Sequence, residues 1–192
     1  NLDAQLRLEM RSEIRRIVKE NGLTGVYVTH DQAEALSIAD RLAVMDGGQV
    51  QQVGTPEEIY RNPRSSYVAS FIGETNLLGG KITDVTGPRT AGVGTDAGEF
   101  AGRITDDEWV PVVGEKAHVS IRPEAIRISA EDGDLQGRVV ETMYLGETIQ
   151  YRVCVGAEME IQVSEMNPRV VLGEGSQVAL DFKAEDVVVL RD

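Results

Sequence analysis

The sequence predicts an α/β segment at the N-terminus followed by an all-β region. Apolar residues recur at helical spacing from Leu6 to Val18, and a short β-branched run, "VYVT", leads into a second helical pattern after His30. From Thr75 onward the hydrophobic period changes to two, which is typical of half-buried strands. This β-rich region also repeats itself, which indicates a duplicated small unit.

The first elements alternate between helix and strand. The first helix is expected to end at Asn21 and Gly22, a common stop signal. "VYVT" is expected to form a strand buried on both faces, because it is continuously apolar and β-branched. Asp31, with Glu34 three residues later, predicts the start of a helix that runs to about Ala39.

Three further elements follow before the β-rich region. "RLAVMDGGQVQQVG" predicts two short strands joined by a turn at residues 46–48. "TPEEIYRNP" predicts a helix with Thr55 as its N-cap and Glu58 closing a capping box. "SSYVASFIG" predicts one more short helix, which ends at Gly73.

The expected domains are residues 1–74 and 75–192. Within the second, "VSIRPEAIRI" matches "LDFKAEDVVV" position by position, so we expect an internal duplication over about 75–130 and 131–192. Each copy is small for an independent core, and the two are therefore expected to pack against each other.

The charge of the chain excludes one class of partner. With 32 acidic and 19 basic residues, the net charge is −13. Nucleic acid is therefore not an expected partner, and simple adsorption to an anionic membrane is disfavoured, because both need a basic surface. No apolar run approaches the roughly 20 residues that cross a bilayer, so a membrane role is expected only through partners.

Two further features concern the chain as a whole. Cys154 is the only cysteine, which excludes an internal disulfide, and its apolar neighbours favour a small core residue over a reactive thiol. The sequence begins without Met, already on the threshold of a helix, and we interpret it as a piece of a longer protein.

Several segments, taken in order, resemble a known family. "NLDAQLR", "VYVTHDQAEALSIADRLAVMDGGQVQQVGTPEEIYRNP" and "YVASFIG" resemble the end of the nucleotide-binding domain of ABC-type import ATPases, most closely the maltose, polyamine and ferric-iron subfamily. "SIRPEAIRI" and "YLGETIQYRV" resemble the TOBE-type oligomer-binding-fold domain of the same subfamily. The resemblance implies an α/β remnant of a P-loop nucleotide-binding domain, followed by two packed oligomer-binding-like β units.

The resemblance also implies two functional residues. His30 stands where the family has its switch histidine, which reaches the γ-phosphate of ATP, and Asp3 in "NLD" stands in the D-loop, which contacts the opposing subunit. From the residues alone, each could instead cap the helix that follows it. The other histidine, His118, lies in a β run and is interpreted as a strand or surface residue.

Other parts of the ATPase are absent from the sequence. It contains no GxxxxGK[ST] phosphate loop, no acidic pair for Mg²⁺ after a strand and no LSGGQ-type signature. ATP and Mg²⁺ are therefore expected cofactors of the complete protein, while residues 1–192 alone are expected to be inactive, with no metal site. The glycine-rich "GPRTAGVGTDAG" lacks the lysine and is interpreted as a loop.

By resemblance, the protein is the ATP-binding subunit of an ABC importer, and "FIGETNLL" favours the polyamine branch. The implied partners are a second copy of the subunit, transmembrane permease subunits and, indirectly, a solute-binding protein. The implied location is peripheral, at the cytoplasmic face of the bacterial plasma membrane. A ferric-iron or sugar importer is an alternative, as is a small-ligand-binding or regulatory β module with no ATPase role.

Overall fold

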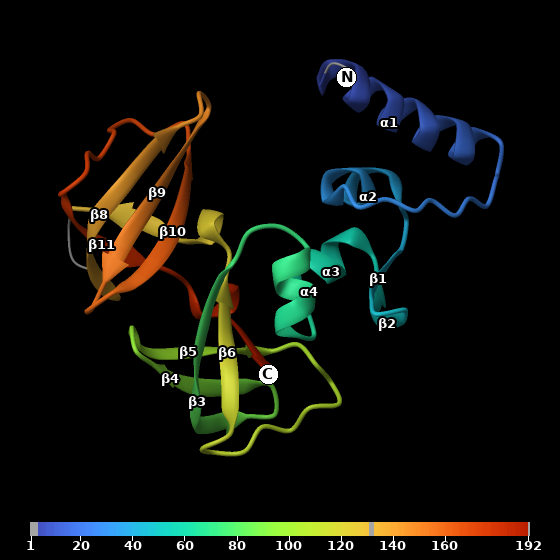
Figure 1. Cartoon of the computed structure of the whole chain (residues 1–192). Coiled ribbons are helices and arrows are strands. Elements are labelled where there is room, and N and C mark those ends of the chain that lie inside the picture. The colour runs from blue at the N-terminus through green and yellow to red at the C-terminus, as the bar shows by residue number, and fades with distance from the viewer. Residues whose placement is uncertain (1–3, 131–132, 192) are drawn as a thin grey trace. The chain divides into compact units, whose positions relative to one another are not determined.

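A computed structural model describes residues 4–130 and 133–191 (Figure 1). The chain divides into two compact units, Asn1–Pro63 and Arg64–Asp192, so the division falls earlier in the chain than the boundary expected after residue 74. No helix in the described part of the chain is both long and apolar enough to span a membrane.

The N-terminal unit combines short helices with one β-hairpin. Its first helix ends as expected: Gly22 adopts a left-handed φ of 62°, and the Leu23 N–H donates to the Val18 carbonyl at 2.9 Å, which closes the last turn. The elements of this unit are α1 (Ala4–Glu20), α2 (Gln32–Ile38), β1 (Leu42–Asp46), β2 (Gln49–Gly54) and α3 (Pro56–Arg61).

The predicted hairpin and capping box are confirmed. Strands β1 and β2 pair antiparallel, and the two residues between them, Gly47 and Gly48, have φ values of 53° and 79°. Both values are positive, as the favoured two-residue hairpin turn requires. At α3, the Thr55 side chain accepts from the Glu58 N–H, and the Glu58 carboxylate accepts from the Thr55 N–H.

The prediction of a strand at "VYVT" is wrong. Residues 23–29 form no strand, and Val26 and Val28 are 93% and 92% exposed. A strand exists only through its hydrogen bonds to a neighbouring strand, and none of the described strands pairs with this segment. The α/β sheet expected here is therefore not seen.

The second unit is mostly β (Figure 1). It begins with helix α4 (Ser66–Phe71) and has two β layers. A closed barrel has the strand order β12-β5-β4-β3-β6, from β3 (Asn76–Gly87), β4 (Thr90–Thr95), β5 (Gly98–Ile104), β6 (Lys116–Ile121) and β12 (Val188–Arg191). A five-stranded sheet has the order β10-β9-β8-β11-β7, from β7 (Arg127–Ser129), β8 (Leu135–Tyr144), β9 (Thr148–Val155), β10 (Met159–Met166) and β11 (Gln177–Asp181).

The repeated segments exchange strands between these layers. The first copy runs through β6, the short 3₁₀ helix η1 (Pro123–Ala125) and β7, and the second through β11, η2 (Ala184–Asp186) and β12. β6 lies in the barrel but β7 joins the five-stranded sheet, whereas β11 lies in that sheet and β12 returns to the barrel. Each layer is therefore completed by the other copy.

One apolar core joins the two layers. It includes Phe100 from the barrel and Tyr151 from the five-stranded sheet, each 1% exposed. The buried Asn76 side chain adds a polar link, because it donates to the Gln162 carbonyl at 2.8 Å and accepts from the Gln162 N–H at 2.7 Å. The expectation that the β units would be oligomer-binding-like and packed together is confirmed at this level.

Helix α4 belongs to the β-rich unit. Its buried Ala69 packs with Val188 and Leu190 of β12. The Arg122 guanidinium donates to the backbone carbonyls of Ala69 and Glu74 at 3.0 and 2.9 Å. These bonds satisfy carbonyls at and just beyond the end of α4 and fix the helix to the barrel.

Candidate functional site

The segment that contains His30 is held by the start of α2. Asp31 is the N-cap, and its carboxylate accepts from the Glu34 N–H at 3.0 Å. The Glu34 carboxylate accepts in turn from the hydroxyls of Thr29 at 2.8 Å and Tyr27 at 3.2 Å. The residues on both sides of His30 are thus fixed by local bonds, as the predicted capping pair requires.

Helix α1 contacts α2 through charged residues. The Arg11 guanidinium lies 3.0 Å from the Asp31 carboxylate and 3.8 Å from that of Glu34, and its side chain is only 14% exposed. Two turns further along α1, Lys19 pairs with Asp40 at 2.7 Å. Between them, Arg15 donates to the carbonyl of Ile38 at 2.8 Å, where α2 ends.

These contacts shift the pKa values of three groups. The pKa of Asp31 is lowered, first by the hydrogen bond from the Glu34 N–H and then by the Arg11 charge. The pKa of Asp40 is lowered, chiefly by the hydrogen bond from Lys19. The pKa of Tyr27 is raised, because its hydroxyl donates to the Glu34 carboxylate.

Acidification should therefore loosen α1 from α2. Because both aspartate pKa values are depressed, their stabilisation is fully present above the unfolded value of about 3.9 and is lost as the pH falls through the lower folded values. An NMR titration of the Glu34 amide should show this loss below about pH 4. In Arg11→Gln the same transition should move to higher pH, and an unmoved midpoint would contradict a role for Arg11.

His30 itself is exposed, so its ring is accessible from solvent. Among the described residues, no hydrogen bond or ion pair to its side chain is seen, whereas its neighbours Thr29 and Asp31 are both bonded. The alternative in which His30 caps α2 is not adopted, because Asp31 holds that position. Asp3 lies outside the described residues.

Arg11 and Glu34 were not predicted as members of this site. Glu34 was expected only to open a helix, yet it collects contacts from Tyr27, Thr29 and Arg11. The sequence did carry a signal: Arg11, Arg15 and Lys19 recur every four residues and so share one face of α1.

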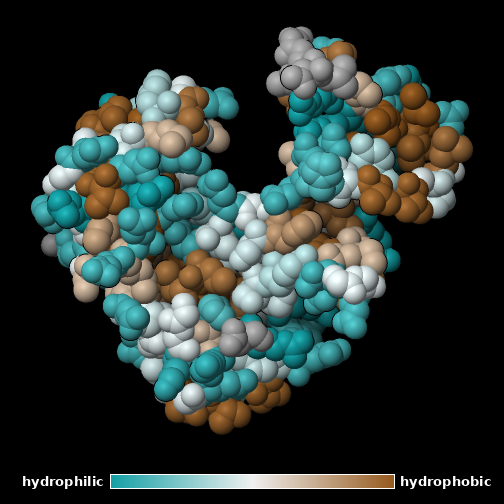
Figure 2. All heavy atoms as spheres, in the orientation of Figure 1, coloured by the Kyte–Doolittle hydropathy of each residue, from teal (hydrophilic) through white to brown (hydrophobic). Residues whose placement is uncertain are grey.

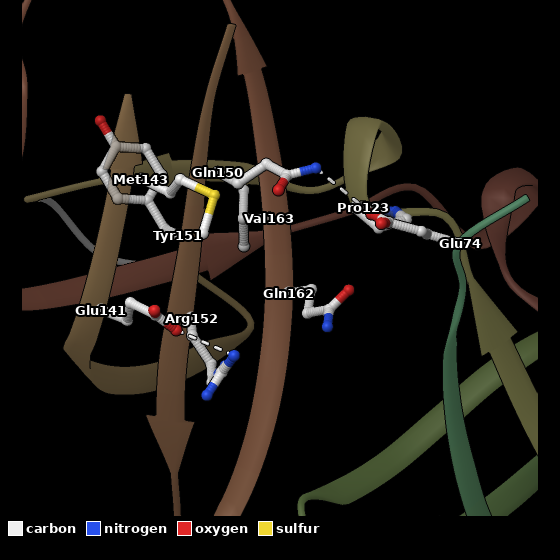
Figure 3. Close-up of a pocket in the computed structure, with 9 residues that line it drawn as sticks. All are labelled: Glu74, Pro123, Glu141, Met143, Gln150, Tyr151, Arg152, Gln162 and Val163. Atoms are coloured by element: carbon white, nitrogen blue, oxygen red, sulfur yellow. Dashed lines mark hydrogen bonds and ion pairs between the residues drawn. The ribbon is translucent and has the colours of Figure 1, made fainter. Parts of the chain in front are cut away.

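A second candidate site is a pocket on the β-rich unit (Figure 3). Arg152 is neutralised there by Glu141 at 2.8 Å and Glu160 at 3.5 Å. The Glu74 carboxylate accepts from Gln150 at 3.3 Å. The pocket therefore combines carboxylates and carboxamides with apolar side chains. It is lined by Glu74, Pro123, Glu141, Met143, Gln150, Tyr151, Arg152, Gln162 and Val163.

The interpretation of Cys154 as a core residue is wrong. It is half-buried, while its strand neighbours Val153 and Val155 are buried. Side chains alternate along a strand, so those two valines face the core and Cys154 faces the outer side of the sheet.

Residues 119–190 match the TOBE domain family. This match lies within the β-rich unit. The cytoplasmic molybdate-binding protein ModG has a similar fold, with a TM-score of 0.54 and 13% identity over 61% of this chain and 96% of its own. At that identity the likeness concerns the fold alone, and it supports the oligomer-binding-like reading of the TOBE domain.

The chain is also similar to spermidine/putrescine import ATP-binding proteins. It is 38% identical to the spermidine/putrescine import ATP-binding protein PotA of Pseudomonas fluorescens, over 100% of this chain and 52% of the relative. It is 36% identical to the protein of that name from Rubrobacter xylanophilus, over 98% of this chain and 51% of the relative. The chain thus spans about half the length of these relatives.

Proposed function

We propose that the chain forms part of the ATP-binding subunit of an ABC importer, which couples ATP hydrolysis to solute uptake, with a polyamine as the favoured solute. The observation that carries the proposal is the similarity to spermidine/putrescine import ATP-binding proteins over 98% to 100% of the chain. In this proposal residues 1–74 are the end of an α/β nucleotide-binding domain, and the TOBE domain follows it.

His30 is assigned to the γ-phosphate of ATP. An imidazole can donate a hydrogen bond to a phosphate oxygen or orient the attacking water, and phosphoryl transfer depends mainly on such positioning and charge stabilisation. Two features of the structure support the assignment: the ring is exposed, and the bonds of Thr29 and Asp31 to neighbouring groups fix the backbone on either side. Asp3 is assigned to the contact with the facing subunit.

Magnesium is assigned to the complete subunit rather than to residues 1–192 alone. Among residues 4–130 and 133–191, no group of three or more His, Cys, Asp or Glu side chains could hold a metal ion. The sequence also lacks a phosphate loop. We therefore assign ATP and Mg²⁺ binding to the complete subunit, and propose that residues 1–192 alone do not hydrolyse ATP.

The proposed partners are a second copy of the subunit, transmembrane permease subunits and, indirectly, a solute-binding protein. The proposed location is the cytoplasmic face of the bacterial plasma membrane. A ligand-binding β module without an ATPase role is less favoured, because the similarity to ATP-binding proteins includes the N-terminal unit as well as the TOBE domain. A ferric-iron or sugar solute is the remaining alternative.

The proposal can be tested in a chimaera. Residues 1–192 would replace the matching half of the Pseudomonas fluorescens protein, and the chimaera would be assembled with that protein's permease and solute-binding protein in proteoliposomes. We expect ATP hydrolysis and uptake of labelled putrescine. A chimaera that assembles and binds ATP but supports neither would contradict the proposal, whereas uptake of only iron or maltose through this chain's own permease would contradict the polyamine assignment.

A further inference from the structure

One end of the five-stranded sheet exposes a group of large apolar side chains. They come from two segments, the last residues of β8 with the turn that follows, and the last residue of β10 with the loop that follows. At this end of the sheet, brown spheres lie among teal ones (Figure 2). Between 46% and 77% of each residue is exposed. We call this group the tip patch; its members are Met143, Tyr144, Leu145, Met166, Val170 and Val171.

The two segments lie against each other. The Asn167 N–H donates to the Glu147 carbonyl at 2.7 Å, and the Thr142 hydroxyl donates to the Leu172 carbonyl at 2.8 Å. Asn167 has a φ of 51°, the only positive value among non-glycine residues in the described structure. Asparagine adopts this left-handed conformation more readily than most residues. The two hydrogen bonds join the segments, so the apolar side chains that they carry are brought together before any partner arrives.

The composition of the tip patch is that of an interface. Methionine and tyrosine are enriched where proteins bind each other, since methionine adapts to the shape of a partner and tyrosine adds a large, rigid contact area. Large continuous apolar patches on soluble proteins commonly mark sites of interaction. The core does not need these side chains, since it is formed by inward-facing residues such as Ile149 and Val163, which are fully buried.

Charge indicates the kind of partner. The exposed Glu147 and Glu174 lie in the same two segments, and Arg169 is the only basic residue within residues 166–176. Over residues 64–192, 22 acidic residues face 12 basic ones, a net charge of −10. A second copy would bring like charges together, and an anionic membrane would be repelled, whereas a basic partner is attracted.

We propose that the tip patch binds an amphipathic segment of another protein that presents leucine-like side chains flanked by lysine or arginine. The apolar face of such a segment covers the methionine, tyrosine and valine side chains, while its basic residues meet the acidic rim. This is the arrangement by which methionine-rich acidic surfaces accept basic helices. The proposal concerns the TOBE domain alone and does not depend on the proposed ATPase role.

The probe is a labelled helical peptide of leucine and lysine, about 18 residues long so that it is helical when bound. Fluorescence anisotropy with the 192-residue chain should show binding, and a leucine–glutamate peptide of the same pattern should bind at least about tenfold more weakly. Tyr144→Ser with Val171→Ser should weaken binding by the leucine–lysine peptide at least about fivefold, as loss of a central interface residue does. Glu147→Gln with Glu174→Gln should also weaken it.

Val112→Ser is the matched control. Val112 is 65% exposed in the loop between β5 and β6, outside the tip patch, and its loss should leave peptide binding unchanged. Equal weakening by Val112→Ser would overturn the proposal, as would equal binding of the two peptides. Sedimentation as a dimer that Tyr144→Ser abolishes would assign the tip patch to a second copy, and tighter binding to phosphatidylglycerol vesicles than to the peptide would assign it to membrane.

Discussion

Replacing His30 by alanine in the complete subunit is expected to lower kcat for ATP hydrolysis by about 100-fold or more, the usual cost of losing one donor that stabilises charge in the transition state. Nucleotide affinity should change little, because a group that acts mainly in the transition state contributes little to ground-state binding. Steady-state hydrolysis and equilibrium binding of a fluorescent ATP analogue, measured on the same preparation, separate the two effects.

The control for His30→Ala is Ser37→Ala, which changes an exposed residue on α2, the helix that follows His30. Its turnover should match that of the unchanged protein. Because His30 is exposed, His30→Ala should also leave the thermal midpoint unchanged, so a fall in turnover cannot be ascribed to unfolding. Full turnover in His30→Ala would remove this histidine from the mechanism.

The elements whose conformation depends only on residues close together in the sequence were predicted correctly. The turn at Gly47 and Gly48 needs only two residues that tolerate positive φ, and the capping box from Thr55 to Glu58 spans four residues. Their energetics are local and can be inferred from a short stretch. "VYVT" differs, because its apolar character shows that it would suit a buried strand but does not provide a strand to pair with.

The exchange between repeats could not be inferred from the repeat itself. Val119 and Leu180 are equivalent positions whether each copy folds alone or donates its last strand to the other. In the structure Val119 pairs with Val189, and Leu180 pairs with Ile128. The direction of the chain through η1 or η2 decides whether the last strand stays with its own repeat or joins the other. The sequence of such a short connection indicates little about that direction.

The local structure around His30 was predicted in part, while its role stays a prediction. The junction of an apolar run with a helix start located His30, and the Asp31 cap is confirmed. The contact between Arg11 and Asp31 joins residues that are 20 positions apart, so it depends on how α1 docks on α2. Helix spacing indicated a basic face on α1 but not what that face would meet.

Because β12 belongs to the second repeat but completes the barrel, a C-terminal truncation is expected to destabilise the barrel. Removal of residues 188–192 deletes β12, which closes the barrel between β5 and β6. Three of the five side chains removed are buried and apolar: Val188, Val189 and Leu190 are 5%, 1% and 1% exposed. Burial of each contributes about 1.5–3 kcal/mol, so their summed loss is comparable with the stability of a whole domain, about 5–15 kcal/mol.

The damage should therefore appear in the first repeat, although the deletion lies in the second. Hydrogen exchange should show loss of amide protection in β3, β4 and β5, while β8 and β9, which keep their strand neighbours in the five-stranded sheet, lose less. Leu190→Ala, which leaves the backbone of β12 in place, should cost only about 2–5 kcal/mol and spare the barrel. If amide protection were instead lost first in β8 to β11, each repeat would be folding with its own last strand. That result would contradict the exchange of last strands between the repeats.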